Sequence, residues 1–103
     1  MSKEKEYTLK LLSHEIQVVI EDPGDWAEGS MGRADLMQQK VHINSSMPKD
    51  ARDSTLIHEL VHLISDMNSL ELTEIHVDVI STGFFSFLRD NSELVYSLLE
   101  PEK

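Results

Sequence analysis

The amino-acid sequence predicts an α+β fold in which a small antiparallel sheet is followed by two helices and a short third helix. Short runs of strand-favouring residues fill the first 44 positions, whereas apolar residues recur at helical spacing after position 48. The chain has 103 residues, a length that suits one domain over 1–103. We therefore expect the sheet at 7–44 and the helices at 48–100.

Two strand-like runs begin the chain, at residues 7–12 and 15–20. The stretch 21–32 contains Pro23 and several glycines, which predicts an irregular loop. Trp26 lies within this loop. A lone tryptophan more often fills a small core, and lining a substrate cleft is the alternative interpretation.

A second hairpin is predicted from residues 33–37 and 40–44. Alternation in the latter run places Val41 and Ile43 on one face and His42 on the other. The ordinary interpretation of His42 is a half-exposed strand histidine, with contact to substrate or metal as the alternative. We expect 40–44 to lie at an edge of the sheet, where an extended peptide could add as a further strand.

Residues 50–67 have the apolar spacing of a helix that packs one face against a core. Pro48 is expected in the first turn, and Asp50 and Asp53 suit the positive end of the helix. The predicted apolar stripe consists of Leu56, Leu60, Leu63, Ile64 and Met67.

This helix carries His58-Glu59-Leu60-Val61-His62, an H-E-x-x-H motif. Residues four apart lie on one face of a helix, about 5–6 Å apart between Cβ atoms, so both imidazoles can reach one metal ion. Glu59 is offset by about 100° and stands beside the metal, where a general base takes a proton from a zinc-bound water. The motif predicts a zinc site with His58 and His62 as ligands and Glu59 as the catalytic base. A core helix with two surface histidines is the alternative.

A catalytic zinc usually takes three protein ligands, so we looked for the third on the next helix. Residues 72–88 have the pattern of a second helix, with Thr73 or Ser69 as its N-cap. The short connection between the two helices predicts an antiparallel helical hairpin.

Two carboxylates of the second helix face the motif in such a hairpin. Glu74 arrives near the level of His62, so we predict it to be the third zinc ligand. Asp78 arrives one turn further, near His58, and is expected to accept a hydrogen bond from its ring N–H. Such a carboxylate fixes the tautomer of the histidine. An exchange of the roles of Glu74 and Asp78 is the alternative, because both lie on one face.

Two neighbouring residues are weaker candidates for ligands. His76 is rotated by about 200° from Glu74 and is expected to point into solvent, away from the metal. Glu71 shares the face of Glu74 but is expected in or before the first turn, where a negative charge favours the start of a helix.

The carboxy-terminal part of the chain is strongly apolar. We expect these side chains to form the core between the second and third helices, and an exposed dimer patch is the alternative. Tyr96 could supply a hydroxyl to the site, although its place in an apolar run favours a packing role. The apolar cluster consists of Phe84, Phe85, Phe87, Leu88, Leu94, Val95, Leu98 and Leu99.

Composition excludes several function classes. The 19 acidic and 9 basic residues give a formal net charge of −10, which disfavours direct binding to nucleic acid. The absence of cysteine excludes disulfides and thiolate metal sites. No stretch has the length of a membrane span and the amino terminus has no apolar signal segment, so we expect a cytoplasmic protein that does not bind membranes.

An H-E-x-x-H helix followed by a helix with E-x-x-x-D is similar to the gluzincin metallopeptidases. The stretch between Thr55 and Leu94 resembles the small zincins encoded by phages and prophages, which are loosely grouped with the ImmA/IrrE-type metallopeptidases. The resemblance covers roughly residues 30–95. For a phage product, it implies action in the cytoplasm of the host.

This resemblance implies a zinc-dependent peptidase with His58, His62 and Glu74 as ligands and Glu59 as the base. The interval between His62 and Glu74 is shorter than in most large gluzincins, and the carboxy-terminal lobe of larger relatives is missing. That lobe carries His or Tyr residues that stabilise the transition state. The departures predict a peptidase of weak or narrow activity.

Two function classes remain. The first is a zinc metallopeptidase that hydrolyses a peptide or protein substrate through a zinc-activated water. The second is a non-catalytic protein-binding module in which zinc stabilises a small fold. Both bind zinc, so only cleavage of a partner separates them.

Overall fold

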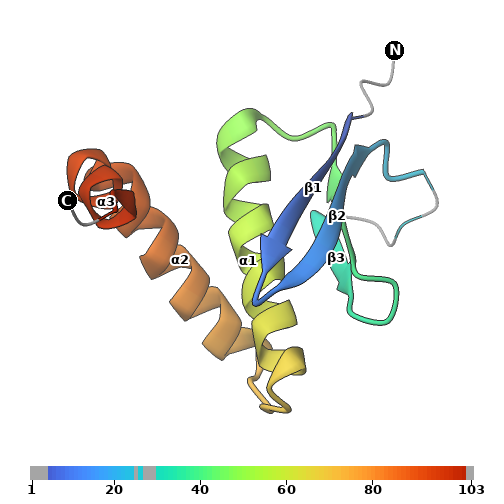
Figure 1. The fold of residues 1–103 in the computed structure, drawn as a ribbon. Coiled ribbons are helices and arrows are strands. Elements are labelled where there is room, and N and C mark those ends of the chain that lie inside the picture. Colours follow the sequence, from blue (N-terminus) through green and yellow to red (C-terminus); the bar gives the residue numbers. More distant parts are fainter. Residues whose placement is uncertain (1–4, 25, 27–29, 102–103) are drawn as a thin grey trace.

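The chain folds into a four-stranded sheet and three helices, described for residues 5–24, 26 and 30–101 by a computed structural model (Figure 1). The predicted α+β class and the order of strands before helices are confirmed. In the predicted loop 21–32, residues 25 and 27–29 lie outside the described residues. No helix in the described ranges combines the length and the apolar character needed to cross a membrane.

The sheet is mixed, with its strands in the order β1-β2-β4-β3. Strands β1 (Lys5–Leu11) and β2 (His14–Glu21) are antiparallel, as are β3 (Gly32–Asp35) and β4 (Lys40–Asn44). The two hairpins join through a parallel pairing of β2 with β4. The prediction of a wholly antiparallel sheet is therefore wrong. Local alternation fixes the face that a residue occupies, but it is the same for parallel and antiparallel neighbours.

The position of β4 also overturns the predicted edge strand. Strand β4 lies between β2 and β3 and is paired on both sides, so a peptide cannot add to it. Strand β3 is the outer strand on that side of the sheet. Local turn and alternation signals predict the hairpin between 33–37 and 40–44, but they do not show on which side the rest of the sheet pairs.

The core lies between one face of the sheet and helix α1 (Lys49–Met67). Alternate residues of β2 and β4 point toward α1 because side chains alternate between the faces of a strand. Leu63 of α1 is fully buried among them. Pro48 is the N-cap of α1 and precedes its first turn. Among the described residues, the largest fully buried side chains are Ile16, Val18, Val41, Ile43, Leu63 and Val77.

Helix α2 (Glu74–Asp90) returns along α1 and diverges from it, and α3 (Ser92–Leu99) lies at its far end (Figure 1). The N-cap of α2 is Thr73, which confirms the first of the two predicted N-caps, Thr73 and Ser69. Among the described elements, α3 has substantial contacts with α2 alone. Only Val77 and Ser81 are buried in α2, and no residue is buried in α3.

The prediction of an apolar core between α2 and α3 is therefore wrong. Phe84 is 55% exposed, Leu98 is 68% exposed and Leu99 is 77% exposed. The apolar pattern of a helix shows that one face needs a partner, but it does not show that a neighbouring helix supplies it. In this chain α3 is too short and too distant from the sheet to cover the face.

Candidate metal centre

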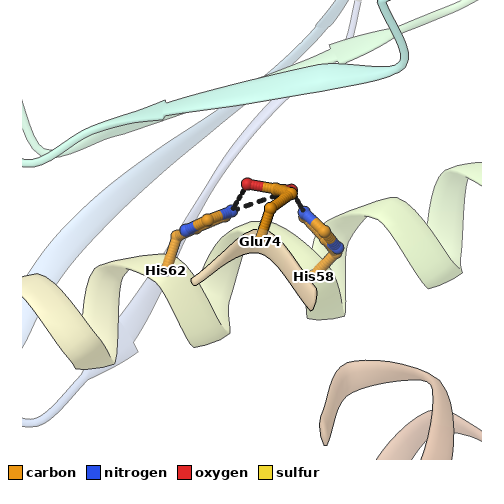
Figure 2. A group of neighbouring side chains, drawn as sticks. All are labelled: His58, His62 and Glu74. Carbon is orange, nitrogen blue, oxygen red and sulfur yellow. Dashed lines mark hydrogen bonds and ion pairs between the residues drawn. The ribbon is translucent and has the colours of Figure 1, made fainter. Parts of the chain in front are cut away.

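Helix α1 presents the two histidines of the motif on one face, one turn apart. The ring centroids of His58 and His62 are 4.9 Å apart. Their Nε2 atoms point toward the carboxylate of Glu74 (Figure 2). The Nε2 atom of His58 is 2.7 Å from Glu74 Oε1, and that of His62 is 3.1 Å from Oε2. The spacing of four residues thus brings both rings to one carboxylate.

Glu74 reaches the histidines because the connection between the helices is short and well bonded. The backbone N–H of Leu70 donates to the carbonyl of Ser65 at 2.9 Å, which closes the end of α1. Ser69 occupies the left-handed region with φ of 55° and reverses the chain. Thr73 then starts α2, so that Glu74 is its first residue. The predicted antiparallel hairpin therefore forms, and Glu74 contacts both histidines.

The three donor groups suit a divalent metal ion. One potential ligand atom from each of His58, His62 and Glu74 lies within 4.8 Å of the other two. Two imidazole nitrogens and one carboxylate are a donor set that catalytic zinc sites use, with a fourth position left for water. Burial alone would raise the pKa of Glu74, but hydrogen bonds from His62 and His58 outweigh this effect and lower its pKa. Glu74 is thus favoured as the carboxylate, the form in which it can bind a cation.

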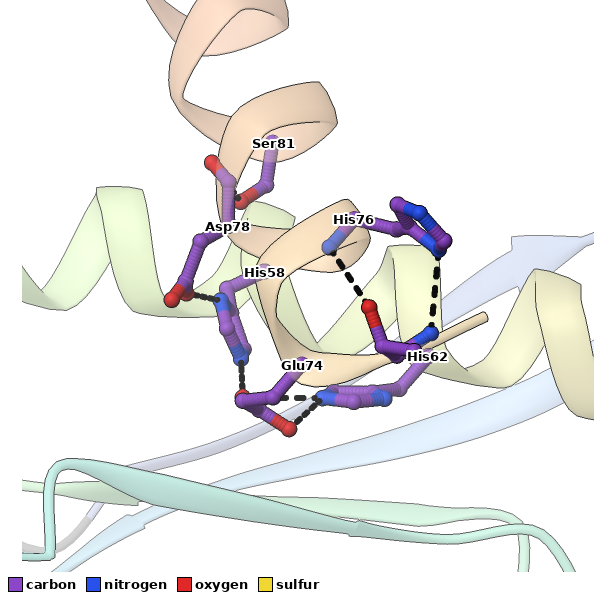
Figure 3. Close-up of polar contacts among 7 residues, drawn as sticks. His58, His62, Glu74, His76, Asp78 and Ser81 are labelled. Carbon is purple, nitrogen blue, oxygen red and sulfur yellow. Dashed lines mark hydrogen bonds and ion pairs between the residues drawn. The ribbon is translucent and has the colours of Figure 1, made fainter. Parts of the chain in front are cut away.

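Asp78 lies on the opposite side of the His58 ring. Its Oδ1 atom is 3.1 Å from His58 Nδ1, one turn of α2 beyond Glu74 (Figure 3). When Nδ1 carries the proton, its N–H donates a hydrogen bond to Asp78, and the Nε2 lone pair is directed toward the candidate metal group formed by His58, His62 and Glu74. The contact agrees with the role expected of Asp78. Because Glu74 contacts Nε2 atoms and Asp78 contacts Nδ1, the geometry does not favour the exchanged assignment.

His76 and Glu71 are not part of the group. The backbone N–H of His76 donates to Thr73 Oγ1, and the N–H of Thr73 donates to His76 Nδ1, both at 3.2 Å (Figure 3). His76 therefore caps the start of α2, a role that the sequence analysis missed. A histidine three residues after a threonine N-cap is the signal that could have indicated it. Glu71 is exposed and precedes the helix.

Glu59 is buried on the sheet side of α1, only 7% exposed, beside the two histidines. Burial raises its pKa, and the neighbouring charge of Glu74 adds to this rise, while His58 and His62 oppose it. A carboxylate with a raised pKa is better matched to proton transfer near neutral pH than an exposed one. Among the described residues, the group of potential ligand atoms comprises His58, His62 and Glu74, and Glu59 lies outside it.

Gly32 of β3 lets the sheet approach Glu59 closely. A Cβ atom at this position would lie 2.7 Å from Thr55 Cγ2 and 2.8 Å from the carbonyl oxygen of His42. It would lie 3.7 Å from Glu59 Cγ. The glycine-rich sequence predicts a loop up to Gly32, whereas Gly32 begins β3 and makes this close contact. The series Thr55, Glu59 and Leu63 at four-residue intervals is the signal that this face of α1 meets the sheet.

The metal group opens into a cleft of about 470 Å³ between β3, α1 and α2. A second hollow of about 310 Å³ lies on the other side of Glu59 and Glu74, toward His62. Strand β3 contributes to both, since Gly32 lines each of them. Apart from Met31, the larger cleft is lined by small or polar residues: Gly32, Ala51, Ser54, Thr55, His58, Glu59, Glu74, Asp78, Ser81 and Thr82.

The remaining candidates lie apart from this cleft. The Nδ1 atom of His42 is 2.7 Å from Glu21 Oε1. The rings of Trp26 and His42 are packed in a T-shaped arrangement, with 6.2 Å between their centroids. Arg33 lies over the Trp26 ring at 5.3 Å. Trp26 thus packs against the sheet and does not line the cleft. Tyr96 is 71% exposed, so the packing role expected of it is wrong, and it does not line the cleft either.

Comparisons of the chain with protein-family models, with curated proteins and with solved structures found no match. The interpretation of the site therefore rests on its geometry.

Proposed function

We propose that the chain is a zinc-dependent metallopeptidase of the H-E-x-x-H gluzincin type, with narrow substrate specificity. The observation that carries the proposal is the convergence of ligand atoms of His58, His62 and Glu74 within 4.8 Å of one another, beside the buried Glu59. His58, His62 and Glu74 would hold the ion. Bound zinc would lower the pKa of a water molecule and polarise the scissile carbonyl.

Glu59 performs the proton transfers in this proposal. Its carboxylate takes the proton of the attacking water and passes it to the amine that leaves. The burial that raises its pKa makes it a stronger base than an exposed glutamate. Asp78 positions His58 through Nδ1, so that Nε2 stays directed at the ion.

Strand β3 is the proposed platform for substrate. It is one of the two outer strands of the sheet, and its Gly32 lines the cleft together with Glu59. An extended peptide added beside β3 would run past the metal group and be held by backbone hydrogen bonds. Small side chains of the cleft, such as Ser54 and Thr82, would contact the side chains of the bound peptide.

Narrow activity follows from the lining of the cleft. Among the described residues around it, neither tyrosine nor a third histidine is present to stabilise an oxyanion. The loss of one such donor costs about 10²–10³ in rate. We therefore expect slow turnover of unstructured proteins and faster cleavage of a substrate that docks onto the rim of the cleft.

Metal content tests the first half of the proposal. Elemental analysis is expected to find about one zinc per chain after reconstitution. His58→Ala and His62→Ala should lose zinc, whereas Glu59→Gln should retain it, because glutamine keeps the shape of a residue that is not a ligand. His14→Ala, an exposed histidine of β2, is the matched control. Loss of zinc by Glu59→Gln equal to that of the histidine variants would refute the role of Glu59.

Cleavage tests the second half. A proteome-derived peptide library is incubated with the zinc-loaded protein, and new amino termini are identified by mass spectrometry. We expect a small set of related cleavage sites that Glu59→Gln abolishes, and little digestion of casein. If the zinc-loaded protein cleaves no library peptide and no protein that binds to it, this result would favour the non-catalytic binding module.

A further inference from the structure

The helix pair α1–α2 has a second hollow on the side away from the metal group. This apolar groove of about 350 Å³ is lined almost entirely by aliphatic and aromatic side chains. Ile57, Leu60, Val61 and Ile64 of α1 form one wall, and Phe84 of α2 belongs to the other. None of these residues lines the cleft at His58, so the two hollows use different faces of the same helices.

The groove continues into an exposed apolar stripe on α2. Ile80, Phe84 and Phe87 follow one another at intervals of four and three residues, which places them on one face. They are 46%, 55% and 37% exposed. The rings of Phe84 and Phe87 are 6.3 Å apart between centroids. Helix α3 adds Leu94 and Leu98, which are 48% and 68% exposed.

The size of this surface exceeds what one chain normally exposes. Aromatic side chains bury about 150–250 Å² each, so half-exposed residues of this size present roughly 100 Å² each. The stripe, the α3 residues and the groove walls together give on the order of 800 Å² of apolar surface. A typical monomer has a largest apolar patch of about 300–600 Å². A stable interface needs about 800 Å² from each partner.

We propose that this surface is the interface of a homodimer, in which α3 of one copy lies in the α1–α2 groove of the other. Both halves of the contact are present on one chain: an apolar groove, and an apolar helix with no buried residue. A two-fold axis uses the same contact twice and closes the assembly. The eight residues of α3 span about 12 Å, a length that fits across a helix pair.

The charge of the chain does not prevent this pairing. Two copies of formal charge −10 repel one another, but salt at physiological strength limits this repulsion to about 8 Å. The groove walls contain no charged side chain, so no unpaired charge is buried. The cleft at His58 shares no lining residue with the groove, so the proposed contact does not use the residues of that cleft.

Sedimentation and light scattering of the full chain test the proposal. The mass is expected to approach twice the 11.8 kDa of one chain across a micromolar concentration series. Leu98→Asp and Phe84→Asp should weaken the dimer by about 30-fold or more, because each buries an unpaired charge at the interface. Both residues are more than half exposed in one chain, so the variants should keep the circular dichroism of the folded protein.

Met37→Asp is the matched control, since Met37 is 96% exposed in the β3–β4 turn and lies outside the surface. It should leave the dimer intact. The arrangement itself is tested by mixing Leu98→Cys with Ile57→Cys, because the chain has no cysteine of its own. Oxidation should link the two variants to each other. A monomeric wild-type chain, a dimer that Leu98→Asp leaves intact, or the absence of the mixed disulfide would overturn the proposal.

Discussion

Gly32→Ala is expected to destabilise the protein because β3 and α1 meet at this residue without space for a side chain. The new Cβ would lie 2.7 Å from Thr55 Cγ2 and 2.8 Å from the carbonyl oxygen of His42. Both distances are well below van der Waals contact. Thr55 is buried and β-branched, so its methyl group cannot turn away easily, and the carbonyl belongs to the backbone of β4. The strand or the helix must therefore move.

Overpacking of this kind typically costs about 1–3 kcal/mol. For a domain of this size, about 2 kcal/mol corresponds to a fall in Tm of roughly 8–16 °C. Thermal unfolding followed by circular dichroism, at one chain concentration and with a chelator present, measures the effect without a contribution from bound metal.

Gly83→Ala is the matched control for the same substitution. A Cβ at Gly83 in α2 would meet nothing within 4 Å. Alanine is favoured over glycine in a helix by about 1 kcal/mol, so this variant should unfold at a higher temperature than the wild type. A Gly32→Ala variant as stable as the wild type would show that β3 and α1 are not in close contact.

Two further predictions concern the metal group and the sheet. Glu74→Ala should weaken zinc binding more than Asp78→Asn, whose loss is expected to cost about 10–100-fold, while His76→Ala should leave zinc affinity unchanged. Competition with a chelator ranks the three, and equal weakening by His76→Ala would contradict the assignment. Burial, and then the charge of Asp53, raises the pKa of Tyr7 above its ordinary value of 10.0, so the fold favours the neutral phenol. Stability from this effect is present below about pH 10 and is lost as the pH rises from the unfolded pKa through the folded one. Urea unfolding at a series of alkaline pH values should show a steeper decline for the wild type than for Tyr7→Phe, and equal declines would count against it.

The convergence of His58, His62 and Glu74 was accessible to sequence analysis because local geometry determines it. The interval from His58 to His62 is fixed by the helical period, and a short connection brings the start of the next helix back to the same level. The contact of Glu74 with both histidines follows from these two constraints. Asp78 follows in turn, since it lies one turn beyond Glu74 on the same face.

The parts that the sequence did not reveal depend on distant contacts. The parallel pairing of β2 with β4 joins segments whose alternation is compatible with either direction. The close contact at Gly32 depends on how tightly β3 approaches α1, which no local pattern records. The exposure of Phe84 shows the same limit, because an amphipathic helix indicates a missing partner without identifying it.

The position of the metal group within one helical hairpin has a consequence for the folding of the chain. All three potential ligands lie between positions 58 and 74, so their assembly closes only a short loop. The sheet requires β2 to find β4 across the intervening loop and β3, which is a slower, long-range step. An ion that binds the closed hairpin and not the open chain favours the hairpin by mass action, before the sheet exists. Zinc present during synthesis would then act as a template for α1 and α2, and its removal would slow refolding more than it speeds unfolding.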